Sequence, residues 1–421
     1  MNATLFPVFL WALCLYGYAA GLAQTKTRKT VFILVDGIPA DVLESVPTPH
    51  LDSLSKAGGY LRAYVGGEKG GYSESPTISA VGYNSLLTGT WAHKHNVWDN
   101  DIASPNYHYP TIFRLFKNQY PQKKIAIFSS WLDNRTKLAG EGLAQTGNLR
   151  VDYHADGYEL DTVRFPHDKG RDFMHRIDNQ VVDAATSHLA QYGPDLSWVY
   201  LEYPDDMGHL YGDSDPFRDA VRKMDVQIGR IARAVQDRQR QLKEEWLVVV
   251  TTDHGRDEQT GKSHGGQSPR QRSSWIVTNH PLNHYPRYYT PAVVDIMPTV
   301  ARFMNIAIPP EISRELDGVP LIGAVSLAGV ELNHFQDKLD VTWKALEAAG
   351  TVKIWVSATN AFKTGGRDTY QLLAQVPLRD GRASVDTKKL PSSFYKVVVE
   401  GPSNSVTRWY IPKDQQKQQQ E

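Results

Sequence analysis

Apolar runs alternate with helical patterns along the first three quarters of the chain. Residues 30–35, TVFILV, are continuously apolar and β-branched, which predicts a strand buried on both faces. Residues 172–190 and 216–239 instead carry apolar side chains every three or four positions, which predicts helices. Further strands are predicted at 125–128, 196–201, 246–251 and 275–278. Because helices separate these strands, we expect an α/β fold with a mostly parallel sheet flanked by helices.

The pattern changes after residues 317–323, DGVPLIG. Short strand-like runs then follow without helices, at 339–343, 352–356, 370–376, 383–385, 395–399 and 407–411. This change predicts a catalytic domain over residues 30–323 and a small C-terminal β-sandwich domain over residues 328–412. The glutamine-rich tail, residues 413–421, is expected to be disordered.

The N-terminal segment has the form of a signal peptide. An apolar run from Leu5 to Leu22 is followed by a polar stretch, which predicts cleavage after about residue 23 and a secreted or periplasmic protein without stable membrane insertion. An uncleaved anchor is the alternative, because the run is close to the shortest membrane span. The only cysteine, Cys14, lies in this segment, so the mature chain would contain no disulfide. Lipid attachment to Cys14 is disfavoured because no small residue directly precedes it.

Charge is balanced over the 421 residues, with 46 basic and 46 acidic side chains. This balance gives no global field that would attract nucleic acid or hold a polybasic membrane anchor. Any preference for an anionic partner must therefore be local, as expected for a small-molecule substrate.

Metal-ligating residues follow predicted strands in four separate segments of the chain. The motifs are VDG, PDDMGH, TTDHG and KSHGG, and their candidate ligands are Asp36, Asp205, His209, Asp253, His254 and His264. The carboxyl ends of parallel strands meet at one edge of a sheet, where α/β proteins bind ligands. A mixture of carboxylate and imidazole ligands suits zinc, and six side chains are enough for two divalent ions.

A hydroxyl nucleophile is expected beside these ligands, because no thiol remains in the mature chain. Thr77 and Ser79 both lie just before a predicted helix over residues 80–87. The N–H groups at the start of such a helix would bind phosphoryl oxygens. Four other histidines are expected in loops or at the surface rather than at the metals, namely His93, His95, His280 and His284.

With these motifs in order, residues 30–323 resemble the alkaline phosphatase superfamily, in its type I phosphodiesterase and nucleotide pyrophosphatase branch. Further motifs of the likeness are SLLTG, VVDIMPTVARFMNI and DGVPL. The resemblance implies an alkaline-phosphatase-like fold and two metal sites. One would use Asp205, His209 and His264, and the other Asp36, Asp253, His254 and the nucleophile.

The resemblance also distinguishes between the two hydroxyls. Family nucleophiles lie ten residues before the glycine of the LTG motif, here Gly89, which selects Ser79. Thr77 stays the alternative, because an alignment gap would restore it. The nucleophile implies a covalent phosphoseryl intermediate.

One position departs from the family pattern. Diesterases usually have a threonine nucleophile and a phosphate-binding asparagine three positions later, whereas position 82 here is glycine. Asn84 and Asn100 are the candidates for substrate binding in its place. Phosphodiester or nucleotide pyrophosphate bonds are the favoured substrates.

Other functions share parts of this pattern. Phosphomonoesterase and phosphonate hydrolase activities stay open as alternatives within the superfamily. A sulfatase is disfavoured, because sulfatases need proline and arginine two and four positions after the modified residue, where this chain has Val81 and Tyr83. An inactive exported binding or adhesion protein is the alternative from a different class.

Overall fold

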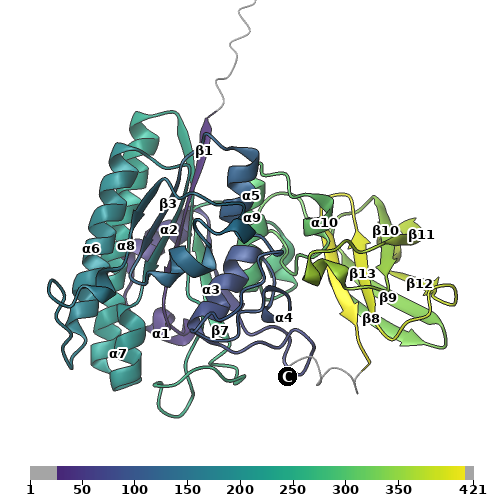
Figure 1. Ribbon diagram of the computed structural model, residues 1–421, viewed down its shortest axis with the longest axis horizontal. Coiled ribbons are helices and arrows are strands. Elements are labelled where there is room, and N and C mark those ends of the chain that lie inside the picture. Colours follow the sequence, from purple (N-terminus) through teal and green to yellow (C-terminus); the bar gives the residue numbers. More distant parts are fainter. Residues whose placement is uncertain (1–25, 413–421) are drawn as a thin grey trace, which may run out of the picture.

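The computed structural model describes residues 26–412 and is built around a seven-stranded sheet (Figure 1). Its strand order is β2-β7-β6-β1-β5-β3-β4. Strands β6, β1, β5, β3 and β4 run parallel to one another, and β7 is antiparallel to both β6 and β2. The strands are β1 (Thr27–Val35), β2 (Gly59–Tyr64), β3 (Ile125–Ser129), β4 (Tyr153–Ala155), β5 (Leu196–Leu201), β6 (Glu244–Thr251) and β7 (Ser273–Thr278). The prediction of a mostly parallel α/β sheet is confirmed.

Helices cover both faces of this sheet, because side chains of a buried strand alternate between the faces. Val31, Ile33 and Val35 of β1 pack in one core with the long helices α6 and α8, whereas Phe32 and Leu34 pack in the other with α3, α5 and α9. The helices are α1 (Ala40–Ser45), α2 (Pro49–Ala57), α3 (Ser79–Thr88), α4 (Ala92–His95), α5 (Ile112–Gln119), α6 (Asp172–Gln191), α7 (Tyr203–Tyr211), α8 (Asp215–Gln241), α9 (Ile296–Phe303) and α10 (Pro310–Ser313).

Two antiparallel sheets form the C-terminal region and lie on the side of the molecule away from α6 and α8 (Figure 1). One has the order β11-β10-β13-β14 and the other β12-β9-β8. Alternate residues of β9, including Leu339, Val341 and Trp343, are buried, as expected for a strand with one face in a core. The strands are β8 (Leu327–Phe335), β9 (Lys338–Ala345), β10 (Thr351–Ser357), β11 (Gln371–Pro377), β12 (Arg382–Asp386), β13 (Tyr395–Glu400) and β14 (Ser405–Tyr410).

Buried ion pairs lie beside Trp409 of β14, where the C-terminal sheets meet the rest of the protein. Lys94 of α4 pairs with Asp317 at 2.6 Å, and Lys396 of β13 pairs with Glu315 at 2.6 Å and Asp368 at 2.7 Å. His93 of α4 lies against Trp409 of β14, with ring centroids 4.7 Å apart. The C-terminal sheets therefore contact α4 through the Trp409 ring, which packs on His93 and Lys94.

The expectation that His93 and His95 lie in loops or at the surface was wrong, since both belong to α4 and are buried. His95 accepts a hydrogen bond at Nδ1 from the Val97 amide and contacts the Ser85 hydroxyl at 3.0 Å through Nε2. Burial lowers the pKa of His95 to about 3, so its imidazole is neutral. Both histidines belong to the packing around α4 rather than to a metal group.

Between residues 26 and 412, no helix combines the length and apolar character needed to cross a bilayer. The predicted signal peptide, with Cys14, and the predicted tail over residues 413–421 lie outside the described residues.

Candidate active site

Three neighbouring parallel strands bring most of the candidate ligands to one edge of the main sheet. Asp36 directly follows β1, Asp205 lies in the first turn of α7 after β5, and Asp253 with His254 follows β6. In the register of these strands Val35 pairs with Leu201 and Leu34 with Thr251, so their carboxyl ends coincide. The parallel pairing thus gathers residues that are more than 200 positions apart in the sequence.

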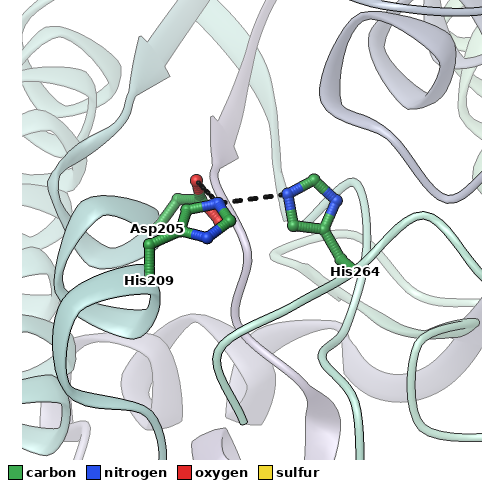
Figure 2. A group of neighbouring side chains, drawn as sticks. All are labelled: Asp205, His209 and His264. Carbon is green, nitrogen blue, oxygen red and sulfur yellow. Dashed lines mark hydrogen bonds and ion pairs between the residues drawn. The ribbon is translucent and has the colours of Figure 1, made fainter.

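The outer group consists of Asp205, His209 and His264 (Figure 2). Asp205 and His209 are one helical turn apart on α7, which places His209 Nε2 3.1 Å from Asp205 Oδ2. His264, in the loop between β6 and β7, brings its Nε2 to 3.2 Å from His209 Nε2. Its Nδ1 donates to the carbonyl of Thr77 at 2.9 Å, which leaves Nε2 with a free lone pair.

The inner group consists of Asp36, Asp253 and His254, all buried. His254 Nε2 lies 3.3 Å from both Asp36 Oδ1 and Asp253 Oδ2. Its Nδ1 donates to the Gly255 carbonyl at 3.0 Å, so Nε2 faces these carboxylate oxygens with a lone pair. Within residues 26–412, neither oxygen has a hydrogen-bond partner. Buried acceptors that face one another without a donor fit a cation between them.

The two groups adjoin each other. The His254 and His264 rings are stacked, with centroids 3.7 Å apart and an angle of 13° between their planes. Each group offers three ligand atoms within 4.8 Å of one another. The arrangement could therefore hold two neighbouring ions.

Electrostatics at this edge favour a bound cation. Burial, reinforced by the charge on Asp205, raises the pKa of Asp36 to about 7. Burial, followed by the charges on Asp36 and Asp205, raises the pKa of Asp253 well above its usual range. Burial lowers the pKa of His254, which keeps its imidazole neutral and able to ligate. The carboxylates of the inner group therefore bind either protons or a metal.

The hydroxyl of Ser79 faces the inner group. Ser79 is the first residue of α3, and its Oγ lies 3.3 Å from His254 Nε2. The hydroxyl of Thr77 is occupied elsewhere, because it accepts from the Gly265 amide at 2.9 Å and donates to the Gly266 carbonyl at 2.8 Å. Thr77 therefore supports the loop that carries His264, and the geometry favours Ser79 as the nucleophile.

Gly82 explains the departure from the family pattern in physical terms. A Cβ atom added at this position would lie 2.9 Å from both the Cβ and the carbonyl oxygen of Asp253. Helix α3 thus packs directly on the segment that carries two ligands of the inner group, and there is no room for an asparagine. The side chain of Asn100 instead reaches the start of this helix, where its Oδ1 accepts from the Ala80 amide at 2.9 Å.

The second candidate for substrate binding is placed differently. Asn84 is buried within α3, five residues after Ser79. Five residues correspond to about 140° around a helix, which is a different face from that of the serine.

Two tyrosines that the sequence reasoning missed hold Asp36 in place. The hydroxyls of Tyr83 and Tyr200 both donate to Asp36 Oδ2, the second at 2.7 Å, and they contact each other at 2.8 Å. This leaves Oδ1 as the free oxygen of Asp36. Tyr83 lies four residues after Ser79 and so shares its face of α3, which is a signal that the spacing offered.

Comparisons with known proteins identify the family of the chain. Residues 30–268, more than half of the chain, match the family described as type I phosphodiesterase/nucleotide pyrophosphatase. Human ectonucleotide pyrophosphatase/phosphodiesterase family member 5 is 23% identical over 236 residues, covering 55% of this chain and 46% of the relative. Human family member 7 is 23% identical over 267 residues, covering 60% and 53%. The chain thus spans about half the length of these curated relatives.

Among solved structures, a 2-O GAG sulfatase matches with a TM-score of 0.51 at 13% identity, covering 86% of each chain. At this identity the likeness shows a shared fold and not a shared reaction. The family match, the order of the motifs and the fold agree. The chain belongs to the type I phosphodiesterase/nucleotide pyrophosphatase family.

Proposed function

We propose that this chain is an exported hydrolase of phosphate esters that cleaves phosphodiester or nucleotide pyrophosphate bonds of small molecules. The contact between Ser79 and the inner of the two adjoining ligand groups is the observation that carries the proposal, with Oγ 3.3 Å from His254 Nε2. Membership of the family supports the reaction class. Export rests on the predicted signal peptide over residues 1–23.

The cofactors we propose are two divalent ions, with zinc favoured by the mixed carboxylate and imidazole ligands. The inner group with Ser79 would hold one ion, and the outer group would hold the other. Bound ions would supply positive charge that favours deprotonation of the serine hydroxyl and stabilises charge on the phosphoryl and leaving oxygens.

Ser79 would act as the nucleophile of an in-line displacement. Its Oγ forms a bond to phosphorus while the bond from phosphorus to the leaving oxygen breaks, which gives a covalent phosphoseryl intermediate. Water then attacks this intermediate and restores the serine. Asn100 is the better of the two candidates for phosphate binding, because its side chain reaches the residue beside the nucleophile.

We assign the catalytic domain to residues 30–323 and an accessory domain to residues 328–412. Every residue of the proposed site belongs to the first of these. The rival role as an inactive binding protein would instead place function in the accessory domain.

Hydrolysis of three chromogenic substrates tests the proposal. These are bis(p-nitrophenyl) phosphate, p-nitrophenyl phosphate and a nucleoside 5′-monophosphate p-nitrophenyl ester, offered to zinc-loaded protein and to chelated protein. We expect chelator-sensitive cleavage with a preference for either diester. A preference for the monoester would make the protein a phosphatase with the same site, and zinc-loaded protein without any activity would favour the binding role.

Substitution of the serine tests its role. Ser79→Ala should lower kcat by about 10⁴-fold or more, because the nucleophile is lost, while zinc content is kept. Ser85→Ala is the matched control, since Ser85 lies in the same helix and its hydroxyl donates to the Val81 carbonyl at 2.7 Å. An active Ser79→Ala protein would reject the assignment.

A further inference from the structure

Arg256 is a buried arginine that connects the segments carrying the carboxylate and imidazole ligands. It lies two residues after His254, and its side chain is fully buried. Its Nε donates to the Gly37 carbonyl at 2.9 Å, next to Asp36. Its Nη2 donates to the Asp205 carbonyl at 2.7 Å and pairs with Asp205 Oδ1, and its Nη1 donates to the carbonyl of Lys262 at 3.2 Å, two residues before His264.

We propose that Arg256 is the positioning residue of the metal centre, holding Asp205 and the segments around it in the arrangement that binds the ion of the outer group. This inference rests on the proposed function, because it assumes that the two groups bind metal. The guanidinium is planar, and its donors point in fixed directions, so bonds to three segments fix their relative positions.

Two motif glycines leave the space that this guanidinium fills. A Cβ atom at Gly208 would lie 2.1 Å from Arg256 Cζ. A Cβ atom at Gly37 would lie 2.8 Å from Arg256 Nη2 and 2.3 Å from Asp205 Oδ1. The glycines of the VDG and MGH motifs and Arg256 are therefore parts of one packed unit beneath the ligands.

The ion pair also decides which oxygen of Asp205 is free. Oδ1 is held by Arg256, so Oδ2 faces His209 at 3.1 Å and completes the outer group. Burial alone would raise the pKa of Asp205, but the Arg256 charge and the His209 bond hold it below its usual range. A lysine could supply the charge but could not reach the three segments at once, because its single ammonium lacks the fork of an arginine.

Arg256→Met removes the guanidinium while keeping a long apolar side chain, and Arg256→Lys keeps the charge. Arg302→Met is the matched control, because Arg302 also donates to backbone carbonyls, including Ile322 at 3.1 Å and Ser403 at 2.7 Å, outside both ligand groups. Zinc binding is measured on metal-free protein by competition with a chromophoric chelator, which resolves the affinities of the two ions. Circular dichroism reports the folded fraction of each variant.

We expect Arg256→Met to weaken the binding of one zinc ion by about 10- to 100-fold, which is typical for loss of a residue that orients a metal ligand. Arg256→Lys should fall between this variant and the wild type, and Arg302→Met should bind both ions as the wild type does. If Arg256→Met does not fold, the zinc affinity of Arg256→Lys alone tests the inference. Wild-type affinity for both ions in the folded Met variant, or in the Lys variant, overturns the inference. Wild-type protein that binds no zinc overturns the proposed function itself.

Discussion

The edge of the main sheet and the contact between α4 and the C-terminal sheets both bury carboxylates, but they neutralise them differently. At the contact, the ammonium groups of Lys94 and Lys396 pair with Asp317, Glu315 and Asp368 at 2.6–2.7 Å. At the sheet edge, three carboxylates converge, from Asp36, Asp205 and Asp253, and Arg256 pairs with one of them.

This difference distinguishes the structural ion pairs at the contact from a cation-binding group at the sheet edge. The contact supplies its own counter-charges, so its buried charges are compensated within the fold. The inner group leaves Asp36 Oδ1 and Asp253 Oδ2 without hydrogen-bond partners in the described part of the chain, which destabilises the metal-free fold. A bound cation would neutralise these carboxylates, as the lysines neutralise those at the contact.

Removal of metal should have the largest effect on the sheet edge. A chelator should abolish hydrolysis, and added zinc should restore it. Zinc should also stabilise the fold by about 4 kcal/mol at a free concentration 1,000 times its Kd. Chelator-titrated thermal unfolding checks this expectation, and a melting temperature that ignores zinc would contradict it.

Loss of a cation at the contact should have an effect on stability alone. Lys396→Met leaves Glu315 and Asp368 buried without their ammonium, which should lower the free energy of unfolding by about 3–5 kcal/mol. Denaturant titration measures the loss. Zinc affinity of the folded variant should stay at the wild-type value, and a large change in that affinity would show that the contact also shapes the site.

Protonation of three buried carboxyls should stabilise the metal-free protein. Burial is the main cause that raises the pKa values of Asp36, Asp178 and Asp295 to about 7, from 3.8 in the unfolded chain. At these three carboxyls the unfolded state holds fewer protons between these values. Their contribution to stability is therefore fully present below about pH 4 and is lost as pH rises through about 7.

A single unit of pKa shift is worth about 1.4 kcal/mol. If one third of the summed pKa shift at these three carboxyls is realised, the free energy of unfolding falls by about 4 kcal/mol as they ionise. Denaturant titrations of chelated and zinc-loaded protein from pH 4 to 8 measure it. The fall should be smaller with zinc, because bound metal keeps Asp36 ionised, and equal slopes in both states would contradict the assignment of Asp36.

The smallest effect should come from removing one unpaired carboxylate. Asp36→Asn should raise the stability of the metal-free protein at pH 8 by about 1.4 kcal/mol, since a neutral amide avoids the burial of charge, while zinc binding is lost. The change in the free energy of unfolding thus has the opposite sign to the change expected for Lys396→Met. Denaturant titration at pH 8 with chelator present compares the two variants, and a destabilised Asp36→Asn protein would contradict our reading of the inner group.

The sequence predicted much of the fold because buried strands have a simple signature. The apolar runs correspond to β1, β3, β5, β6 and β7. It did not predict β2, an edge strand with half-exposed residues, or β4, which has three residues. In the C-terminal region β8 was missed as well, because polar residues alternate along its second half.

The candidate ligands were predictable because strand ends and motif spacing place them, and the structure brings all six into two adjoining groups. Arg256 and Tyr200 were not, since their roles depend on contacts between segments that are distant in the sequence. His93 and His95 were misjudged because the packing of β14 on α4, which surrounds His93, has no local signal.

Mass spectrometry of the trapped intermediate tests the central claim most directly. Zinc-loaded protein would be mixed with bis(p-nitrophenyl) phosphate and quenched in acid within one turnover. The account predicts a p-nitrophenylphosphoryl group on Ser79, absent after chelation and absent in Ser79→Ala. The same group on Thr77, or turnover that persists in Ser79→Ala, would contradict it.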